Sequence, residues 1–214
     1  MKRLFACLLL TVLGQSAWAL DAADQQRLSA IQQGWAHIQY ETPEKQRAAA
    51  FEQLAAQATA FTAERPAVAE AWIWKGIVTS SWAGAQGGLG ALGKAKDAKA
   101  DLEKSLTLDP KALQGSAYTS LAALYDRVPG WPIGFGDSDK AEQLLKQALQ
   151  LNPDGIDSLY FWGDHLYRQK RYAEARAALL KAQQAAPRPG RESADSGRRK
   201  EIAALLADVN KKLD

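Results

Sequence analysis

The sequence predicts an all-α fold, an α-solenoid of stacked antiparallel helical hairpins that ends in a capping helix. Strong helix formers, namely alanine, leucine, glutamine, lysine and glutamate, dominate the composition. No stretch alternates apolar and polar residues with the period of a strand. Prolines also close four successive helical stretches at intervals of 44, 43 and 34 residues: Pro66, Pro110, Pro153 and Pro187. A repeat of this size indicates stacked helical pairs rather than one globular core.

The first 19 residues have the form of an export signal. A basic start, Met1–Arg3, precedes the apolar run Leu4–Leu13, and Ala17-Trp18-Ala19 forms a cleavage site. The run is shorter than the roughly 20 residues that span a bilayer. The only cysteine, Cys7, lies within it. We therefore expect a periplasmic or secreted protein without disulfides, while a retained membrane anchor stays open.

The remaining chain is nearly neutral in charge. Beyond residue 19 it has 25 basic and 24 acidic residues. This balance gives no reason to expect a nucleic-acid partner or a membrane surface, and no later stretch is apolar enough to cross a membrane. The oligomeric state cannot be read from these features.

Helices are expected in order along the chain, each bounded by a proline, a glycine or a polar turn. The expected ranges are 22–40, 44–63, 67–83, 94–108, 111–127, 139–151, 155–169, 172–186 and 194–213. Residues 20–66 would form an N-terminal pair and residues 67–187 three hairpins. Residues 188–214 would form a basic linker and a capping helix.

The hairpin 156–187 shows the packing pattern most clearly. Its first helix places bulky and small residues on one face, at i, i+3, i+4 and i+7: Leu159, Trp162, Gly163 and Leu166. Its second helix repeats small and large residues at i, i+4 and i+7: Ala175, Leu179 and Ala182. Small residues let the two helices approach closely, and Pro187 ends the pair.

This hairpin resembles a tetratricopeptide repeat. Two earlier units resemble it more loosely through Trp72, Lys75-Gly76, Ala98, Leu102, Ser105 and Pro110, and through Tyr118, Leu121-Ala122, Tyr125, Ala141, Leu145, Ala148 and Pro153. The resemblance covers 67–187 and, more weakly, 22–66. It implies a non-catalytic protein that binds another protein or a peptide, and a final helix that covers the open end of the array.

The two looser units exceed the 34-residue pitch, and the surplus falls between their paired helices. We expect inserted loops at 84–93 and 128–138, which would lie along one edge of the array together with the basic turn Arg168–Arg171. The second loop carries Trp131 and Phe135. These aromatic residues either pack back onto the array as a plug or form a recognition loop.

The exposed face of the first helices supplies the other candidate partner-binding residues. Asp157 and Asp164 share a face with residues that can stack and hydrogen-bond to a peptide: Tyr160, Tyr167 and Arg168. Asp126 continues this face in the preceding unit. The alternative is an ordinary solvated helix surface.

Two motifs suggest other chemistry without its context. The stretch Gly88–Lys94 matches the dinucleotide pattern G-x-G-x-x-G and most of a phosphate-binding loop, but Ala95 stands where the latter needs Ser or Thr, and no strand precedes it. Binding of an anion at the helix start near Lys94 fits the sequence better than nucleotide binding does. The basic segment Arg188–Lys200 is interleaved with acidic residues, so we expect solvated or locally paired charges rather than a site for a lipid headgroup or an acidic partner.

No catalytic or metal site is expected. The two histidines, His37 and His165, are far apart in sequence and lack further ligands at metal spacing. No nucleophile motif is present, and no cofactor is expected. Binding of a protein or peptide is therefore the leading functional hypothesis, and a small-solute-binding accessory protein of a transport system is the alternative.

Overall fold

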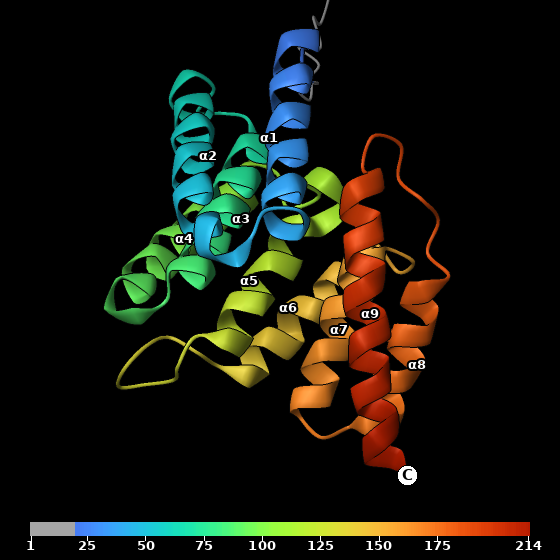
Figure 1. Cartoon of the computed structure of the whole chain (residues 1–214). Helices are drawn as coiled ribbons and strands as arrows, with labels where there is room; N and C mark the ends of the chain where they lie inside the picture. Colours follow the sequence, from blue (N-terminus) through green and yellow to red (C-terminus); the bar gives the residue numbers. More distant parts are fainter. Residues whose placement is uncertain (1–19) are drawn as a thin grey trace, which may run out of the picture.

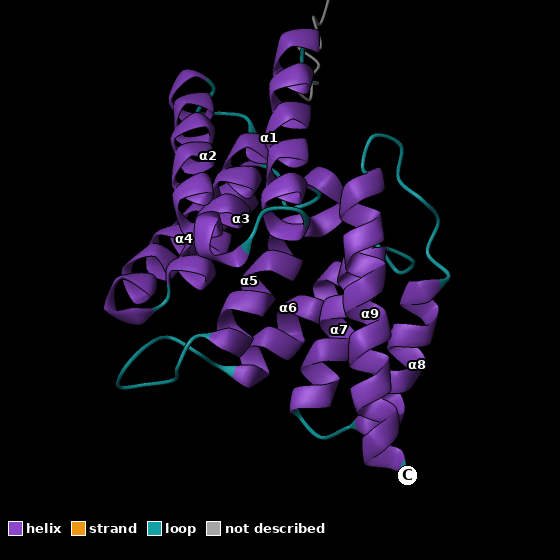
Figure 2. Ribbon diagram, in the orientation of Figure 1, coloured by secondary structure: helices purple, strands orange, loops and turns teal. Residues whose placement is uncertain are grey.

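A computed structural model describes residues 20–214, so the expected export signal at 1–19 lies outside the described residues. This part of the chain folds into nine α-helices and one 3₁₀ turn (Figures 1 and 2). The helices are α1 (Ala22–Tyr40), α2 (Glu44–Glu64), α3 (Ala69–Gln86), α4 (Gly88–Leu108), α5 (Ser116–Arg127), α6 (Ser138–Leu151), α7 (Ile156–Arg168), α8 (Tyr172–Gln183) and α9 (Glu192–Leu213), with the 3₁₀ turn at Ala112–Gly115.

The helices form four consecutive hairpins, α1/α2 to α7/α8, followed by α9 (Figure 1). The first helix of each hairpin also contacts the first helix of the next, which makes α1, α3, α5 and α7 a continuous row. The expected all-α solenoid is confirmed.

In two of the hairpins, α3/α4 and α7/α8, a glycine of the first helix faces a leucine of the second. A side chain on Gly163 of α7 would place its Cβ 2.6 Å from Cγ of Leu179 in α8, and Gly76 of α3 stands in the same relation to Leu102 in α4. Only glycine permits this approach, because real Cβ atoms do not come so close to another atom. Figure 1 shows the resulting close helix pairs.

Helix α9 does more than cover the end of the array. Ile202, Leu206 and Val209 are buried with residues of α8, as expected of a capping helix. The N-terminal half of α9 also packs against α1, at the opposite end of the chain, and against α7. The solenoid therefore closes on itself along one side, with α9 lying next to the end of α1 (Figure 1).

The expected loop at 84–93 is wrong. α3 continues to Gln86 and α4 begins at Gly88, so only Gly87 separates two long helices. The chain reverses there because Gly87 and Gly88 adopt φ angles of 62° and 64°, which glycine tolerates. The surplus residues of this unit extend its helices by additional turns instead of forming an insertion.

The second expected insertion is an ordered finger between α5 and α6. A bridge joins Gly130 to Gly136 across its base, and Figure 2 shows it projecting from the body of the molecule. The finger lies beside α4, since a Cβ on Gly134 would sit 3.4 Å from Leu92. The two segments expected as insertions are thus neighbours, although the first one is helical.

Candidate functional site

The concave side of the array holds a cavity of about 1210 Å³. Its walls come from the row of first helices, α1, α3, α5 and α7, and from the beginnings of α2 and α4. Residues 186–191 and the N-terminal half of α9 cover it on the remaining side. The cavity is therefore the inner groove of the solenoid, narrowed by the contact between α9 and α1.

One wall of the cavity is aromatic. The Trp35 ring meets Trp74 at 6.0 Å and Tyr40 at 5.7 Å, both edge to face. Trp35 also donates from Nε1 to Ser81 Oγ at 2.8 Å, which anchors its ring between α1 and α3. Phe161 of α7 lines the other side. Such rings offer large apolar contact with fixed geometry.

Other lining residues can exchange hydrogen bonds with a ligand. Hydroxyl groups of α3 and α5 line the cavity: Ser80, Ser116, Thr119 and Ser120. Arg47 lines it from α2, where its Nε donates to the carbonyl of Thr42 at 2.9 Å. A mostly apolar hollow with a few convergent polar groups is the usual form of a binding site.

An ionic cluster fastens the segment before α9 to α7. Asp157 accepts hydrogen bonds from Arg188 at 2.7 Å and from Arg198 at 2.8 Å. Arg188 also pairs with Asp195, and Arg198 with Glu201. Burial opposes ionisation of Asp157, but the charges of Arg198 and Arg188 outweigh it and hold the pKa of Asp157 well below its ordinary range.

The contact between α1 and α9, which we call the seam, combines polar contacts with one small buried residue, Ala194 of α9. The Tyr40 ring lies directly against Gly197, where any side chain would collide with it. Tyr40 Oη lies 3.4 Å from Glu201, and Ser193 Oγ donates to Glu41 Oε1 at 2.5 Å. Burial raises the pKa of Tyr40, so its hydroxyl stays neutral at physiological pH.

Arg191 lies between the seam and the aromatic wall. Its guanidinium carbon is 5.0 Å from the centre of the Trp74 ring, and its side chain is partly buried. No carboxylate in residues 20–214 forms an ion pair with it. Burial, reinforced by the charge of Arg188, lowers the pKa of Arg191.

Comparison with protein families and solved structures agrees with this architecture. Models of the tetratricopeptide repeat match residues 133–188 and residues 89–112. The chain therefore contains tetratricopeptide repeats. The crystal structure of a thermophilic tetratricopeptide protein from Thermus thermophilus aligns with a TM-score of 0.57 and 18% identity, over 86% of this chain and 98% of that one. At this identity the likeness concerns the fold. No curated protein matches the sequence significantly.

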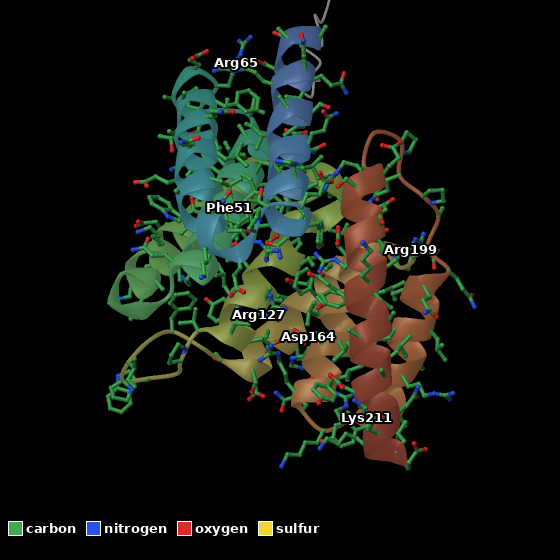
Figure 3. All side chains as sticks on the ribbon, viewed as in Figure 1. Phe51, Arg65, Arg127, Asp164, Arg199 and Lys211 are labelled. Atoms are coloured by element: carbon green, nitrogen blue, oxygen red, sulfur yellow. The ribbon has the colours of Figure 1, made fainter. Side chains whose placement is uncertain are left out.

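The predicted groove residues of this tetratricopeptide protein do not form one surface. Tyr160 lines the cavity, with the Arg198 guanidinium carbon 4.3 Å from its ring centre. Asp164 is buried and accepts from Arg127 of α5 at 2.9 Å and from Arg168 at 3.2 Å. Figure 3 shows Arg127 and Asp164 together where α5 meets α7. Asp164 thus joins two repeats and is not among the residues that line the cavity.

Asp126, another predicted binding residue, belongs to a buried cluster. Both of its carboxylate oxygens lie 3.0 Å from Nδ1 of His165, which is fully buried. Burial lowers the pKa of His165. The carboxylates of Asp126 and, at a greater distance, Glu142 raise it by more than burial lowers it, so the pKa lies above its ordinary value. Within residues 20–214, no group of three or more potential ligands is arranged to hold a metal ion.

The remaining predicted residues lie near the outer end of α7 and in the finger. Tyr167 packs against Tyr172 of α8 at 5.6 Å. Phe135 packs against Tyr125 at 5.5 Å and anchors the finger. Trp131, in contrast, is 90% exposed at the tip, where Ile133 is 68% exposed. The plug hypothesis therefore fits Phe135 and fails for Trp131.

The segment that matches the phosphate-binding loop pattern does not have the structure of such a loop. Gly88–Lys94 is the first part of α4 rather than a loop after a strand, and Lys94 Nζ lies 4.1 Å from the centre of the Trp82 ring. Searching residues 20–214 for helices of sufficient length and hydropathy yields none that could cross a membrane.

Sequence reasoning missed most residues that line the cavity. Trp74 lines the cavity and also contacts Trp35 of α1. In the basic segment, local pairs do form, as between Arg198 and Glu201. The link from Arg198 to Asp157 had no signal, because the two residues are 41 positions apart.

Proposed function

We propose that this tetratricopeptide protein is an exported, non-catalytic scaffold that binds a segment of a partner protein on its concave side. Arrays of this kind are interaction scaffolds because stacked hairpins present a long inner surface. The observation that carries the proposal is the large cavity along the row of first helices, with an aromatic wall and hydroxyl groups.

The size of the cavity favours a polypeptide segment over a small molecule. At about 1210 Å³ it exceeds the roughly 300–1,000 Å³ of typical small-molecule sites. Phe161, beside the mostly buried rings of Trp35 and Trp74, would receive an apolar side chain, and the hydroxyl groups of α3 and α5 would bond to the peptide backbone. Aromatic anchors of this kind carry much of the energy of protein interfaces.

The finger would provide a second contact at the loop-bearing edge. Trp131 is exposed to water at the tip of the finger. The lower part of the finger is kept ordered by Phe135 and by the bridge between Gly130 and Gly136. An ordered tip loses less conformational entropy on binding than a flexible loop. Exposed tryptophan at such a tip is a typical interface residue.

A role without catalysis agrees with the state of the ionisable groups. The Asp126–His165 pair is buried away from any substrate, and Asp164 and Asp157 are each engaged by two arginines. These groups act as links between helices. An exported location follows only from residues 1–19 and is part of the proposal; secretion of a mature chain that begins at Leu20 would support it.

A small-solute-binding accessory protein is the second candidate. The specific observation in its favour is the cover formed by residues 186–191 and α9, which narrows the groove from one side. An open repeat array would not enclose a small ligand in this way.

A cavity-filling substitution tests the leading proposal. In Ala123→Trp, an indole ring would occupy the cavity from α5, and in the matched control Ala177→Trp the ring would lie on the exposed face of α8. Proteins cross-linked to the wild-type chain in envelope extract are identified by mass spectrometry. We expect Ala123→Trp to lose the specific partner and Ala177→Trp to keep it.

Two further results decide between the surfaces. If the partner survives Ala123→Trp in a folded protein, the cavity is not the binding site. If Trp131→Ala alone abolishes capture, the finger is the main contact. A thermal-shift screen with metabolites addresses the second candidate, since a ligand that binds the native state raises the melting temperature.

A further inference from the structure

Arg191 differs from the other arginines at the closure of the solenoid. Arg188 is balanced by Asp157 and Asp195, and Arg198 by Asp157 and Glu201. Arg191 stands next to them without an ion pair to any carboxylate in the described part of the chain, and its side chain makes no hydrogen bond there. It is the arginine of this cluster whose guanidinium makes no direct contact with a carboxylate in residues 20–214.

At this position, the lack of a directly bonded carboxylate is unfavourable for the charge of Arg191. The side chain is partly buried and lies over the Trp74 ring, and the charge of Arg188 repels it, while Asp157 and Asp195 attract it only from a distance. A desolvated charge needs a counter-charge or hydrogen bonds to offset the loss of water. Because Arg191 lines the cavity, a ligand in the cavity can supply them.

The surrounding wall holds further donors that lack an acceptor. Trp74 is 4% exposed, and its Nε1 has no hydrogen-bond partner in the described residues. Arg47 lines the same cavity and uses only its Nε, on the carbonyl of Thr42, while no ion pair joins its guanidinium to a carboxylate in residues 20–214. Of the carboxylates that line the cavity, Asp154, Asp157 and Glu201 are paired with basic side chains, and Glu44 is exposed at the start of α2. The donors of Arg191 and Trp74 therefore have no acceptor in the described residues.

We propose that the corner of the cavity formed by Arg191 and Trp74 binds a carboxylate of the ligand. The guanidinium offers paired N–H donors that match a carboxylate, and stacking on the indole ring fixes their plane. The rest of the ligand lies against the apolar rings of Trp35 and Phe161. The proposal rests on the function proposed above and adds the chemistry that the cavity recognises.

A carboxylate can come from two sources, a free organic acid or an acidic side chain of a partner segment. Two matched pairs of probes separate the effect of charge from that of shape. The first pair is indole-3-acetate and indole-3-acetamide. The second is a capped pentapeptide with a central glutamate and the same peptide with a central glutamine. Binding of each probe to the full chain is measured by titration calorimetry. The variants are Arg191→Gln, Arg191→Lys and the control Arg176→Gln on the exposed side of α8, where Arg176 bonds to Asn210.

We expect at least one acid to bind about tenfold or more tightly than its uncharged partner, as for one charge-assisted hydrogen bond. Arg191→Gln should remove this advantage, Arg191→Lys should retain part of it, and Arg176→Gln should leave it unchanged. The pair that shows the effect identifies the source. A melting curve for each variant confirms that it is folded.

Two results would overturn the assignment. One is that neither acid binds the wild-type chain at millimolar concentration. The other is that acid and uncharged partner bind equally, or that Arg191→Gln leaves the acid's advantage intact. If the acid and its uncharged partner bind equally to the wild-type chain and neither binds to Ala123→Trp, the cavity remains a binding site and only the carboxylate subsite is wrong. If the wild-type chain binds the acid but captures no specific protein partner, the scaffold proposal is wrong and the carboxylate subsite stands.

Discussion

The two sides of α9 are held by different kinds of contact. Towards α8, Ile202, Leu206 and Val209 join a continuous apolar cluster. Towards α1, the seam has Tyr40 against Gly197, the hydrogen bond from Ser193 to Glu41, and a single buried methyl group, that of Ala194. One side of the helix belongs to the core of the protein, whereas the other is a polar closure over the cavity.

This difference sets the order in which the contacts can open. Burying an isoleucine, leucine or valine side chain contributes about 1.5–3 kcal/mol each. Exposed polar pairs contribute about 0–1 kcal/mol, because water replaces them when they separate. The seam should therefore open while α9 stays docked on α8, and this opening would admit a ligand to the cavity.

The largest expected effect comes from the apolar side. Ile202 is fully buried, so Ile202→Ala should lower the free energy of unfolding by about 2–5 kcal/mol through lost burial and the cavity left behind. Chemical denaturation measures this change. A loss below about 1 kcal/mol would mean that α9 is not part of the core, and the contrast between its two sides would fail.

Gly197→Ala acts on the seam and should have a smaller effect. The added methyl group collides with the Tyr40 ring, so α9 and α1 must move apart. Overpacking costs about 1–3 kcal/mol, and the higher helix propensity of alanine offsets up to about 1 kcal/mol of it. We expect faster amide hydrogen exchange around Tyr40 and Ser193, with unchanged protection around Ile202.

The double variant Tyr40→Ala/Gly197→Ala is the control for this collision. Removing the ring makes room for the methyl group, so any strain should disappear while the seam stays weakened. If Gly197→Ala leaves exchange at the seam unchanged, the ring has moved without opening it. In that case α1 and α9 are joined more firmly than their contacts indicate.

The sequence predicts the helical hairpins better than the contact between α1 and α9. The reason is the separation along the sequence of the residues that meet. Gly163 and Leu179, or Gly76 and Leu102, meet within one unit, so the same pattern recurs along the chain. The contact between Tyr40 and Gly197 joins the two ends of the array once. No period signals it, and the cavity that depends on it could not be predicted.

The helical start of α4 shows a second limit. Glycines at 84–93 suggested a loop, but only Gly87 and Gly88 need positive φ. The alanines, leucine and lysine around them favour helix, and the turn needs one residue between α3 and α4. Similarly, Asp126 and Asp164 lie on the predicted inner helices but are used between repeats, by His165 and Arg127, rather than by a ligand.

The smallest expected effect is a dependence of the closure on pH through Asp157. Its folded-state pKa is depressed below the ordinary value of 3.8, so its contribution to stability is present above about pH 4 and is lost as pH falls through the folded-state pKa. Its side chain is 34% exposed, which limits this contribution to about 1 kcal/mol. Asp157→Asn should therefore be slightly less stable than wild type at pH 7, and the two should converge on acidification.

Denaturation curves between pH 7 and pH 3 measure the difference between wild type and Asp157→Asn, which cancels the titration of other carboxylates. Asp208→Asn is the matched control, because Asp208 pairs with Lys211 near the exposed end of α9, away from the seam. Its difference from wild type should be small at every pH. If the Asp157→Asn difference stays constant down to pH 3, Asp157 is not a charged link in the closure. The apolar side of α9 would then hold the closure as well, and the two sides could not open separately.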